Sequence, residues 1–385
     1  MALPGEYVTL HTTVKTVLCT YSWIRGGLKP SWTRRWPAYK NGLVERNTVA
    51  YGDYLADLCN QYGVDVLSGY YQAKGDNPLV NFRASLWATA RLNRVKLCHM
   101  AGLVGFNEPL TRSKIQTEVI SWANDMRNAK YARIRLADNT TRAILMFWGN
   151  EYVSDYNAFV AMLNTIRSEY RRLGVGEVFI ILTDHIVPLA AGNVPGAVQV
   201  MNAIDGVYHH AAGLPWETCG GCDKSGVEWN GTQSAQQLGK DLNNEGAVVR
   251  RFGKYYIPGG MPSFDRDLFE ADGTARQGRV VCTTPAEVRT IFRTIKNYST
   301  PIWSDSQVLT DGEHIYEEHW TSVTSCAEWE EGSTVEPSLV RTTAYTAPYW
   351  DYGTDRMAAI AEVFRDTTRR IRSGEPIVPE PLAVG

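Results

Sequence analysis

The stretch "RAILMFWGNEYVSDYNAFVAMLNTIRSEYRRLGVGEVFIILT", residues 142–183, contains two apolar runs separated by an amphipathic segment. The runs at 142–148 and 177–183 are apolar almost throughout, which is typical of parallel strands that are covered on both faces. Between them, apolar side chains recur at helical spacing, at Phe159, Leu163, Ile166 and Tyr170. The stretch therefore predicts a strand, a helix and a second strand parallel to the first.

Similar strand–helix pairs follow one another along the rest of the chain. Further strands are predicted at residues 15–23, 64–71, 94–100, 204–210, 254–258 and 321–327. Further helices are predicted at residues 51–62, 79–91, 115–126, 284–297 and 357–371. Ser154 is expected to cap the helix of the quoted stretch. Thr284 and Glu287 form a capping box around Pro285 at the first helical position.

Eight predicted strands that alternate with helices along 385 residues predict an α/β protein, a single (β/α)8 TIM barrel over residues 1–373. The Pro-rich stretch at 374–385 is expected to be a disordered tail. A doubly wound parallel sheet with an appended domain is the alternative. That fold places a Gly-rich turn after its first strand, and "YSWIRGGLKP" at 21–30 lacks the G-x-G-x-x-G pattern.

The composition is that of an ordinary globular protein, with 44% hydrophobic and 21% charged residues and a formal net charge of -2. This near balance argues against non-specific nucleic-acid binding, which depends on a clustered excess of Lys and Arg. No run reaches the ~18 apolar residues of a membrane span, so no membrane association is expected. The N-terminal residues lack the pattern of a signal peptide, and the location (cytoplasm, virion or secreted after trimming) is left open.

Cys219 and Cys222 form a C-x-x-C motif that has no second pair and no His at zinc-finger spacing. A zinc site would need two more ligands. We therefore expect no metal and no cofactor, and we interpret the two thiols as a local disulfide or as free thiols in a loop.

Polar and aromatic residues gather where the predicted strands end, which is the face of a barrel that holds the chemistry. The chain has 12 Trp and 20 Tyr, whose flat apolar faces and polar edges suit sugars. The candidate substrate-binding residues are Tyr21, Trp23, Tyr70, Trp148, Glu151, Asp184, His209, Asp265, Trp329 and Glu336. Core packing by the aromatic residues and helix capping by the acidic ones are the alternative interpretations.

The segment "TSCAEWEEGSTVEPS", residues 324–338, crowds four glutamates around Trp329. Glycosidic cleavage needs one carboxylic acid for the leaving oxygen and a second carboxylate at the anomeric side. Glu328 and Glu331 can supply this pair if the strand ends near Glu328 and the chain curls at Gly332, because an i, i+3 pair on a straight strand faces opposite ways. Two carboxylates so close raise each other's pKa, which keeps one protonated. A solvated acidic turn is the alternative.

The stretch "SCAEWEEGSTVEP" resembles the pattern S-x-N-E-W-x-E-G-x-x-I-E-P of glycoside hydrolase family 99, the endo-α-mannosidases and their relatives in polysaccharide gene clusters. "KTVLCTYSW", "YARIRLADNTTRAILMFW" and "YYIPGGMPSFDRD" are similar to further motifs of that family and occur in the same order. The chain differs from the final pattern at Ala327 and Glu330, and Asn139 to Thr141 replace a Gly-x-Pro turn. Family 71, which cleaves α-1,3-glucan, has a comparable barrel.

The resemblance implies that Glu328 and Glu331 are the catalytic residues of a retaining glycosidase. Glu328 would act as a base on the 2-hydroxyl of the sugar and give a 1,2-anhydro intermediate. Glu331 would protonate the leaving group and then activate water. Glu336 would orient this pair or bind a hydroxyl.

Three functions are consistent with these residues. The first is a glycoside hydrolase that acts on an α-linked oligosaccharide or polysaccharide with retention. The second is a transglycosylase or glycosyltransferase-like relative on the same barrel, since a retaining site can transfer to a sugar in place of water. The third is a glycan-binding phage or surface protein without turnover. The pair Glu328 and Glu331 favours an enzyme, while the sugar, the linkage and the oligomeric state are left open.

Overall fold

The computed structural model describes residues 15–20, 49–62, 64–73, 87, 95–135, 140–210, 228–263, 279–280, 282–299, 320–324 and 356–364. The strands are β1 (Lys15–Thr20), β2 (Val66–Gln72), β3 (Lys96–Gly102), β4 (Arg133–Arg135), β5 (Thr141–Trp148), β6 (Val178–Thr183), β7 (Gly206–Tyr208), β8 (Glu228–Trp229), β9 (Tyr255–Ile257), β10 (Gly259–Gly260), β11 (Arg279–Val280) and β12 (Trp320–Thr324). The helices are α2 (Val49–Tyr62), α4 (Pro109–Ser121), α5 (Ala123–Met126), α6 (Tyr156–Arg172), α7 (Ile186–Ala191), α8 (Pro195–Ala203), α9 (Gly231–Arg251) and α10 (Pro285–Ser299), with a 3-10 turn η2 (Asn150–Tyr152) and a helical segment at 356–364.

The main sheet has the strand order β10-β12-β1-β2-β3-β5-β6-β7-β9, and every neighbouring pair in this order is parallel. Only Pro258 separates β9 from β10, so the two ends of the order lie on one continuous segment of chain. The backbone N–H of Ser322 donates to the Pro258 carbonyl at 3.0 Å across this junction. The parallel strands therefore occupy eight positions and have the connectivity of a (β/α)8 TIM barrel.

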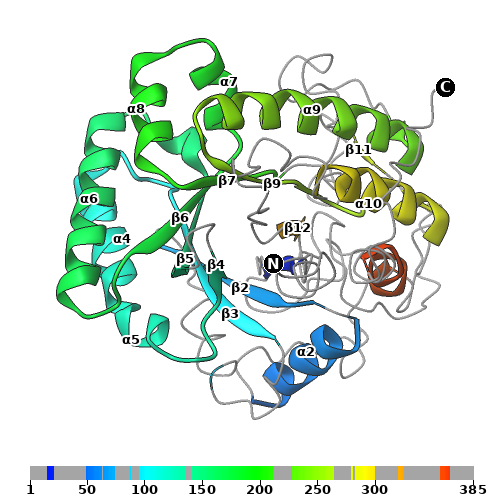
Figure 1. Ribbon diagram of the computed structural model, residues 1–385, viewed down its shortest axis with the longest axis horizontal. Helices are drawn as coiled ribbons and strands as arrows, with labels where there is room; N and C mark the ends of the chain where they lie inside the picture. Colours follow the sequence, from blue (N-terminus) through cyan, green and yellow to red (C-terminus); the bar gives the residue numbers. More distant parts are fainter. Residues whose placement is uncertain are drawn as a thin grey trace, which may run out of the picture.

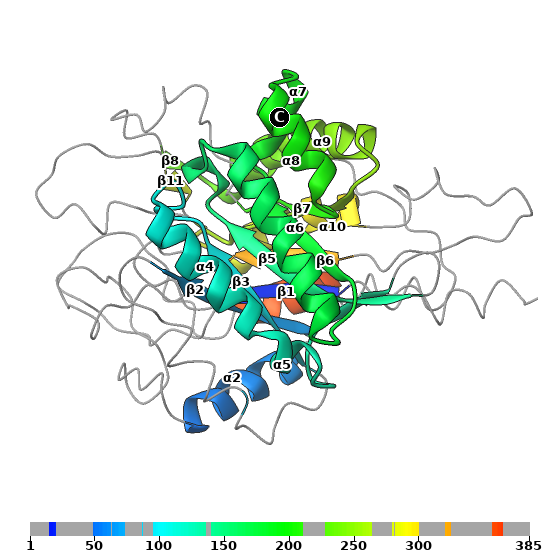
Figure 2. The same ribbon diagram turned by 90° about the vertical axis from the view of Figure 1, so that its left-hand side faces the viewer.

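The helices lie outside the strands, as the view in Figure 1 shows. Seen from the side of α4 and α6, these helices cover β3, β5 and β6 (Figure 2). One buried apolar cluster lies between these strands and α4 to α8. A second joins α2, α9 and α10 to the helical segment at 356–364. The described helices form the outer layer, and this arrangement confirms the predicted fold class.

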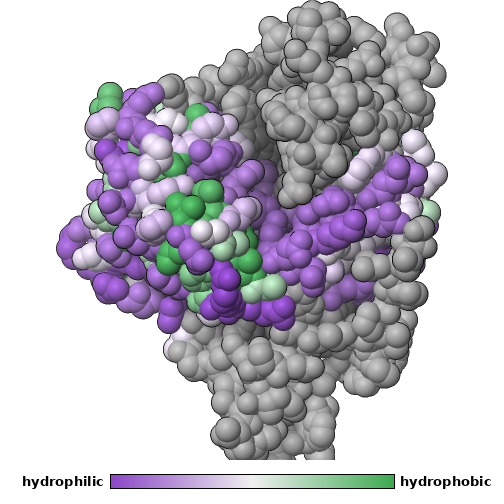
Figure 3. Space-filling model, turned by 90° about the horizontal axis from the view of Figure 1, so that it is seen from above, coloured by the Kyte–Doolittle hydropathy of each residue, from purple (hydrophilic) through white to green (hydrophobic). Residues whose placement is uncertain are grey.

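The outer surface of α9 is hydrophilic, while apolar residues form a patch beside it, at α7 (Figure 3). Leu189 in α7 is 41% exposed, and Val194, just after that helix, is 38% exposed. None of the helices in the described ranges is both long and apolar enough to span a membrane.

The predicted elements that lie in the described part of the chain overlap the observed ones, whereas the helix predicted at 79–91 falls outside it except for residue 87. The caps of two helices show how well their starts were predicted. The helix after β5 begins at Tyr156, and its N-cap is Asp155, whose side chain accepts from the Ala158 N–H at 2.9 Å. The prediction of Ser154 was therefore wrong by one position. The capping box at the start of α10 is confirmed, because Glu287 accepts from the Thr284 N–H at 3.1 Å and the Glu287 N–H donates to the Thr284 hydroxyl at 3.3 Å.

Helix α9 was not predicted from the sequence. Three glycines lie inside it, at 231, 239 and 246, and glycine disfavours helix. Its start nevertheless carries a capping box, in which the Asn230 side chain accepts from the N–H groups of Thr232 and Gln233 at 3.0 Å each. The buried residues Ala235, Leu238, Leu242 and Val249 then face the strands. This helix carries Glu245, which contacts the end of β7.

Candidate active site

Side chains alternate between the inside and the outside of the ring along each strand. The Tyr208 hydroxyl lies 3.3 Å from the Met100 sulfur, although β7 and β3 are separated by β6 and β5 in the strand order. This contact crosses the ring, so Tyr208 and Met100 point inward. By alternation, His209 points outward and His210 points inward.

An aromatic and imidazole cluster lies on the inner face where the strands end. The Trp148 indole N–H donates to His210 Nε2 at 2.9 Å, and the Tyr70 ring meets Trp148 edge-on at 5.7 Å between centroids. Trp148 and His210 are half-buried, while Tyr70 is buried. A Cβ at Gly102 would lie 2.2 Å from the Tyr70 hydroxyl, so glycine at this position makes room for the Tyr70 ring. The cluster offers a flat apolar face of the kind that stacks on sugars.

His210 is held as a neutral imidazole. Burial lowers its pKa to about 3, and the neighbouring carboxylate of Asp184 only partly offsets this. Since Nε2 accepts from Trp148, the proton of the neutral ring resides on Nδ1, which lies 3.5 Å from the Tyr208 hydroxyl.

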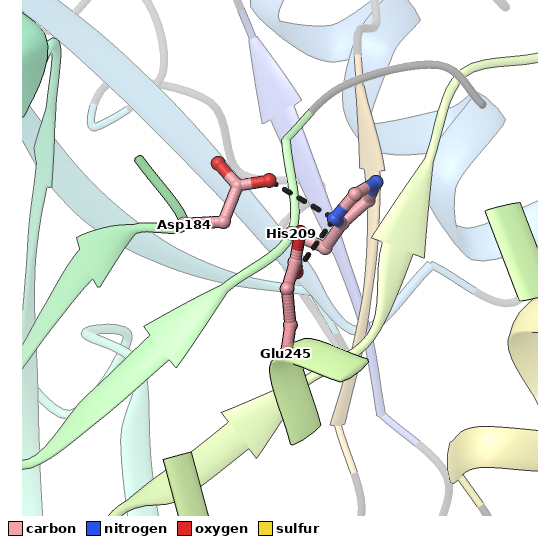
Figure 4. Close-up of side chains that lie close together, drawn as sticks. All are labelled: Asp184, His209 and Glu245. Carbon is pink, nitrogen blue, oxygen red and sulfur yellow. Dashed lines mark hydrogen bonds and ion pairs between the residues drawn. The ribbon is translucent and has the colours of Figure 1, made fainter. Parts of the chain in front are cut away.

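Asp184, His209 and Glu245 meet behind the inner face, between the ends of β6 and β7 and helix α9 (Figure 4). His209 Nδ1 lies 2.9 Å from Asp184 Oδ2 and 2.9 Å from Glu245 Oε2. The Tyr256 hydroxyl also donates to Glu245 Oε2, at 2.8 Å. The side chains of Asp184, His209 and Glu245 are 8%, 3% and 16% exposed, so water screens their charges poorly. We call these three residues the Asp–His–Glu cluster.

The charges of the Asp–His–Glu cluster depend on one another. Burial favours the neutral form of each group, but the two carboxylates raise the pKa of His209 well above its usual value. Burial would likewise raise the pKa of Asp184, and the adjacent His209 outweighs it and lowers that pKa. For Glu245 burial prevails and the pKa is raised. Burial also raises the pKa of Asp241, one helical turn earlier, to about 6.

The cluster is tied to the inner face through the backbone. The His210 N–H points to Asp184 Oδ2 at 3.4 Å, and the Ser322 hydroxyl donates to the His209 carbonyl at 2.9 Å. The His209 N–H donates to the Ile257 carbonyl at 2.9 Å. The positions of the inward-facing His210 and of the cluster are therefore coupled.

The structure brings the described candidate residues together in two groups. Tyr70 and Trp148 lie on the inner face, while Asp184 and His209 are buried against α9. Glu151 lies at the rim on η2, 34% exposed, with its carboxylate 3.7 Å from His185 Nε2. The remaining candidates fall outside the described residues, and their roles stay predictions: Tyr21, Trp23, Asp265, Glu328, Trp329, Glu331 and Glu336.

Two residues of these groups are not among the predicted site residues. His209 and His210 both follow the same predicted strand, but only His209 was predicted to bind substrate. Glu245 lay in an unpredicted helix, and the Asn230–Gln233 capping box is the signal that could have revealed it.

Comparisons with known proteins confirm the fold. No family model and no curated protein matches this sequence. A solved structure described as a glycoside hydrolase-like protein superposes with a TM-score of 0.62 at 13% identity, over 92% of this chain and 95% of that chain. The family 99 endo-α-mannosidase of Bacteroides thetaiotaomicron superposes with a TM-score of 0.61 at 14% identity, over 94% of this chain and 100% of that chain. Its complex with bis-tris propane gives 0.58 at 14% identity, over 94% and 99%. The chain thus has a fold like that of family 99 along nearly its whole length.

Proposed function

We propose that the protein is a glycoside hydrolase that cleaves an α-linked oligosaccharide or polysaccharide with retention of anomeric configuration. The observation that carries the proposal is the superposition on a family 99 endo-α-mannosidase over 94% of this chain, at a TM-score of 0.61. A shared fold alone does not define a reaction. In this proposal, the glutamate motif that follows β12 in the sequence supplies the chemistry.

The position of β12 supports Glu328 and Glu331 as the catalytic pair. β12 lies between β1 and β10 and runs parallel to both, so the chain leaves the ring at the carboxyl ends of the strands. Its last residue, Thr324, precedes Glu328 by only four positions. Trp148 and His210 occupy the inner face at that same end, where barrel enzymes bind their substrates.

In the proposed reaction, Glu328 takes the proton of the 2-hydroxyl as that oxygen attacks the anomeric carbon. The bond to the leaving oxygen breaks, and Glu331 protonates that oxygen. Water then attacks the anomeric carbon and gives its proton to Glu331, while the 2-oxygen recovers a proton from Glu328. Two inversions at one carbon give net retention, with no ester between sugar and enzyme.

The inner cluster would bind the sugar. We assign the half-buried face of Trp148 as the stacking platform, because His210 accepts a hydrogen bond from the indole N–H and Tyr70 packs against the indole edge-on. Tyr21, Trp23 and Trp329 are proposed as further platforms. Glu151, Asp265 and Glu336 are proposed as ligands of hydroxyl groups. The roles predicted for Asp184 and His209 remain proposals, with His210 as their link to the substrate.

A screen of α-mannan, α-glucan and arabinan oligosaccharides for new reducing ends tests this function. We expect release from at least one α-linked substrate. Longer products without a net gain in reducing ends would indicate transfer to sugar instead of water. Binding of an oligosaccharide without any bond cleavage would contradict the proposal and indicate a glycan-binding protein.

A further inference from the structure

The Asp–His–Glu cluster has the features of a cation site. It combines two carboxylates and one imidazole from three separate elements: the ends of β6 and β7, and helix α9. The ligand atoms of the three side chains lie within 4.8 Å of one another. These groups are common ligands of zinc and other divalent transition metals. We propose that Asp184, His209 and Glu245 bind one divalent transition-metal ion, and this proposal does not depend on the proposed glycosidase reaction.

Charge balance supports this proposal. Two carboxylates and one imidazole are buried together at this point, and a buried carboxylate is costly unless a positive charge lies beside it. A divalent ion between Asp184, Glu245 and a neutral His209 would leave no excess charge among those three groups.

The geometry supports it as well. One N–H on His209 Nδ1 can point straight at only one acceptor, yet two carboxylate oxygens lie at the same distance of 2.9 Å. Atoms bound about 2.0–2.2 Å from a common zinc ion are separated by about 3–3.5 Å. Small movements would therefore bring all three ligands to an ion at that point.

One carboxylate oxygen at the site is also unused. Asp184 Oδ1 is buried and has no hydrogen-bond partner among the described residues. A buried polar atom without a partner is costly unless something else occupies it. Asp184 could use this oxygen as a second ligand atom to the same ion. His209 Nε2 faces away from the other two groups (Figure 4) and is left to carry the ring proton.

A bound ion would join α9 to the carboxyl ends of β6 and β7. Asp184 also accepts from the His210 N–H, so an ion bound to Asp184 would help to hold His210 in position on the inner face. The expectation of no metal rested on Cys219 and Cys222 alone, which lie outside the described residues. The proposed site uses neither thiol.

Metal analysis of the full chain, produced without an affinity tag and without added metal, tests the proposal. We expect about one equivalent of zinc or manganese by elemental analysis. After stripping with a chelator, titration with ZnCl2 or MnCl2 should restore one site. MgCl2 and CaCl2 should bind at least about tenfold more weakly, because these ions prefer all-oxygen sites.

Two variants locate the site. Glu245→Gln keeps an acceptor for the Tyr256 hydroxyl but removes the ligand charge, and it should weaken zinc affinity at least about tenfold. The double variant Cys219→Ser, Cys222→Ser should bind metal like the unmodified protein. Far-UV circular dichroism of the stripped proteins shows that each variant is folded.

Thermal unfolding gives a readout that does not depend on activity. ZnCl2 should raise the melting temperature of the stripped protein by several degrees and leave that of Glu245→Gln unchanged, because a ligand stabilises only the state that binds it. The absence of both stoichiometric metal and measurable binding would overturn the proposal and leave a hydrogen-bonded charge cluster. Binding that survives Glu245→Gln but is lost with the two cysteines would overturn it too.

Discussion

Replacing Asp205, the residue before β7, should destabilise the part of the ring that holds the site. Its Oδ2 accepts from Arg167 Nη2 at 2.8 Å and from the Ile180 N–H at 2.9 Å, so it links α6, β6 and β7. The side chains of Arg167 and Asp205 are 15% and 19% exposed, so solvent screens this pair only partly. Asp205→Ala would remove both hydrogen bonds and leave the Ile180 N–H without its side-chain acceptor.

The expected loss follows from these contacts. Each hydrogen bond to a charged group contributes about 1.5–3 kcal/mol. Arg167 keeps its bonds to the carbonyls of Val178 at 3.2 Å and Ala203 at 2.9 Å, which limits the damage. We therefore expect Asp205→Ala to lower the free energy of unfolding by about 3 kcal/mol, and Asp205→Asn, which keeps an acceptor, by about half as much.

Urea unfolding followed by fluorescence and by circular dichroism measures these losses, provided that the two transitions coincide. Arg167→Met and the double variant complete a cycle that isolates the pair, for which we expect a coupling energy of about 1–2 kcal/mol. A loss below about 0.5 kcal/mol for Asp205→Ala would be typical of an ordinary surface position and would refute this reasoning.

Three further predictions follow from local geometry. A Cβ at Gly259 would lie 1.7 Å from the Ser322 hydroxyl on β12, so Gly259→Ala should lower the free energy of unfolding in urea by about 3 kcal/mol. Gly192→Ala, whose Cβ would have its nearest atoms at 3.6 Å, should change it by less than about 0.5 kcal/mol. Equal effects would count against the fit of β10 on β12. Burial raises the pKa values of the Cys59 and Cys98 thiols to about 12. Mass spectrometry should therefore find both thiols unmodified by iodoacetamide at pH 8 in the folded protein and modified in urea. Rapid labelling of the folded protein would disprove their burial. Asn230→Ala should cost about 1 kcal/mol in the same urea assay through loss of the α9 cap, and an unchanged stability would show that this cap contributes nothing.

The fold could be predicted where local pattern and tertiary environment agree. The apolar runs at 142–148 and 177–183 correspond to β5 and β6. They were recognisable because both faces of these strands are buried in the core and therefore carry apolar side chains. Helix α9 could not be recognised from its apolar pattern, since its glycines and amides weaken the helical signal. Its stability comes from packing against the strands, which the local sequence does not reveal.

The site was predictable only in part, for a similar reason. The sequence places Trp148, Asp184 and His209 at strand ends, and the barrel then brings them to one end of the ring. The sequence does not reveal which of two adjacent histidines points inward. That depends on the register of β7 in the ring, and the contact between Tyr208 and Met100 decides it. Nor could the meeting of Glu245 with His209 be foreseen, because it depends on how α9 lies against β7.

The most direct test of the central claim compares initial rates of reducing-end release by the unmodified protein with those of Glu328→Gln and Glu331→Gln. Glu169→Gln, a change at a partly exposed position on α6 that contacts Arg172, serves as the control. On the first α-linked substrate that is cleaved, we expect each of the two variants to lose about 10²–10⁴-fold in rate, as is typical for a lost acid or base, and the control to lose nothing. Product anomers observed by NMR should show retention. Rates that survive in both Glu328→Gln and Glu331→Gln would contradict the assignment of the catalytic pair.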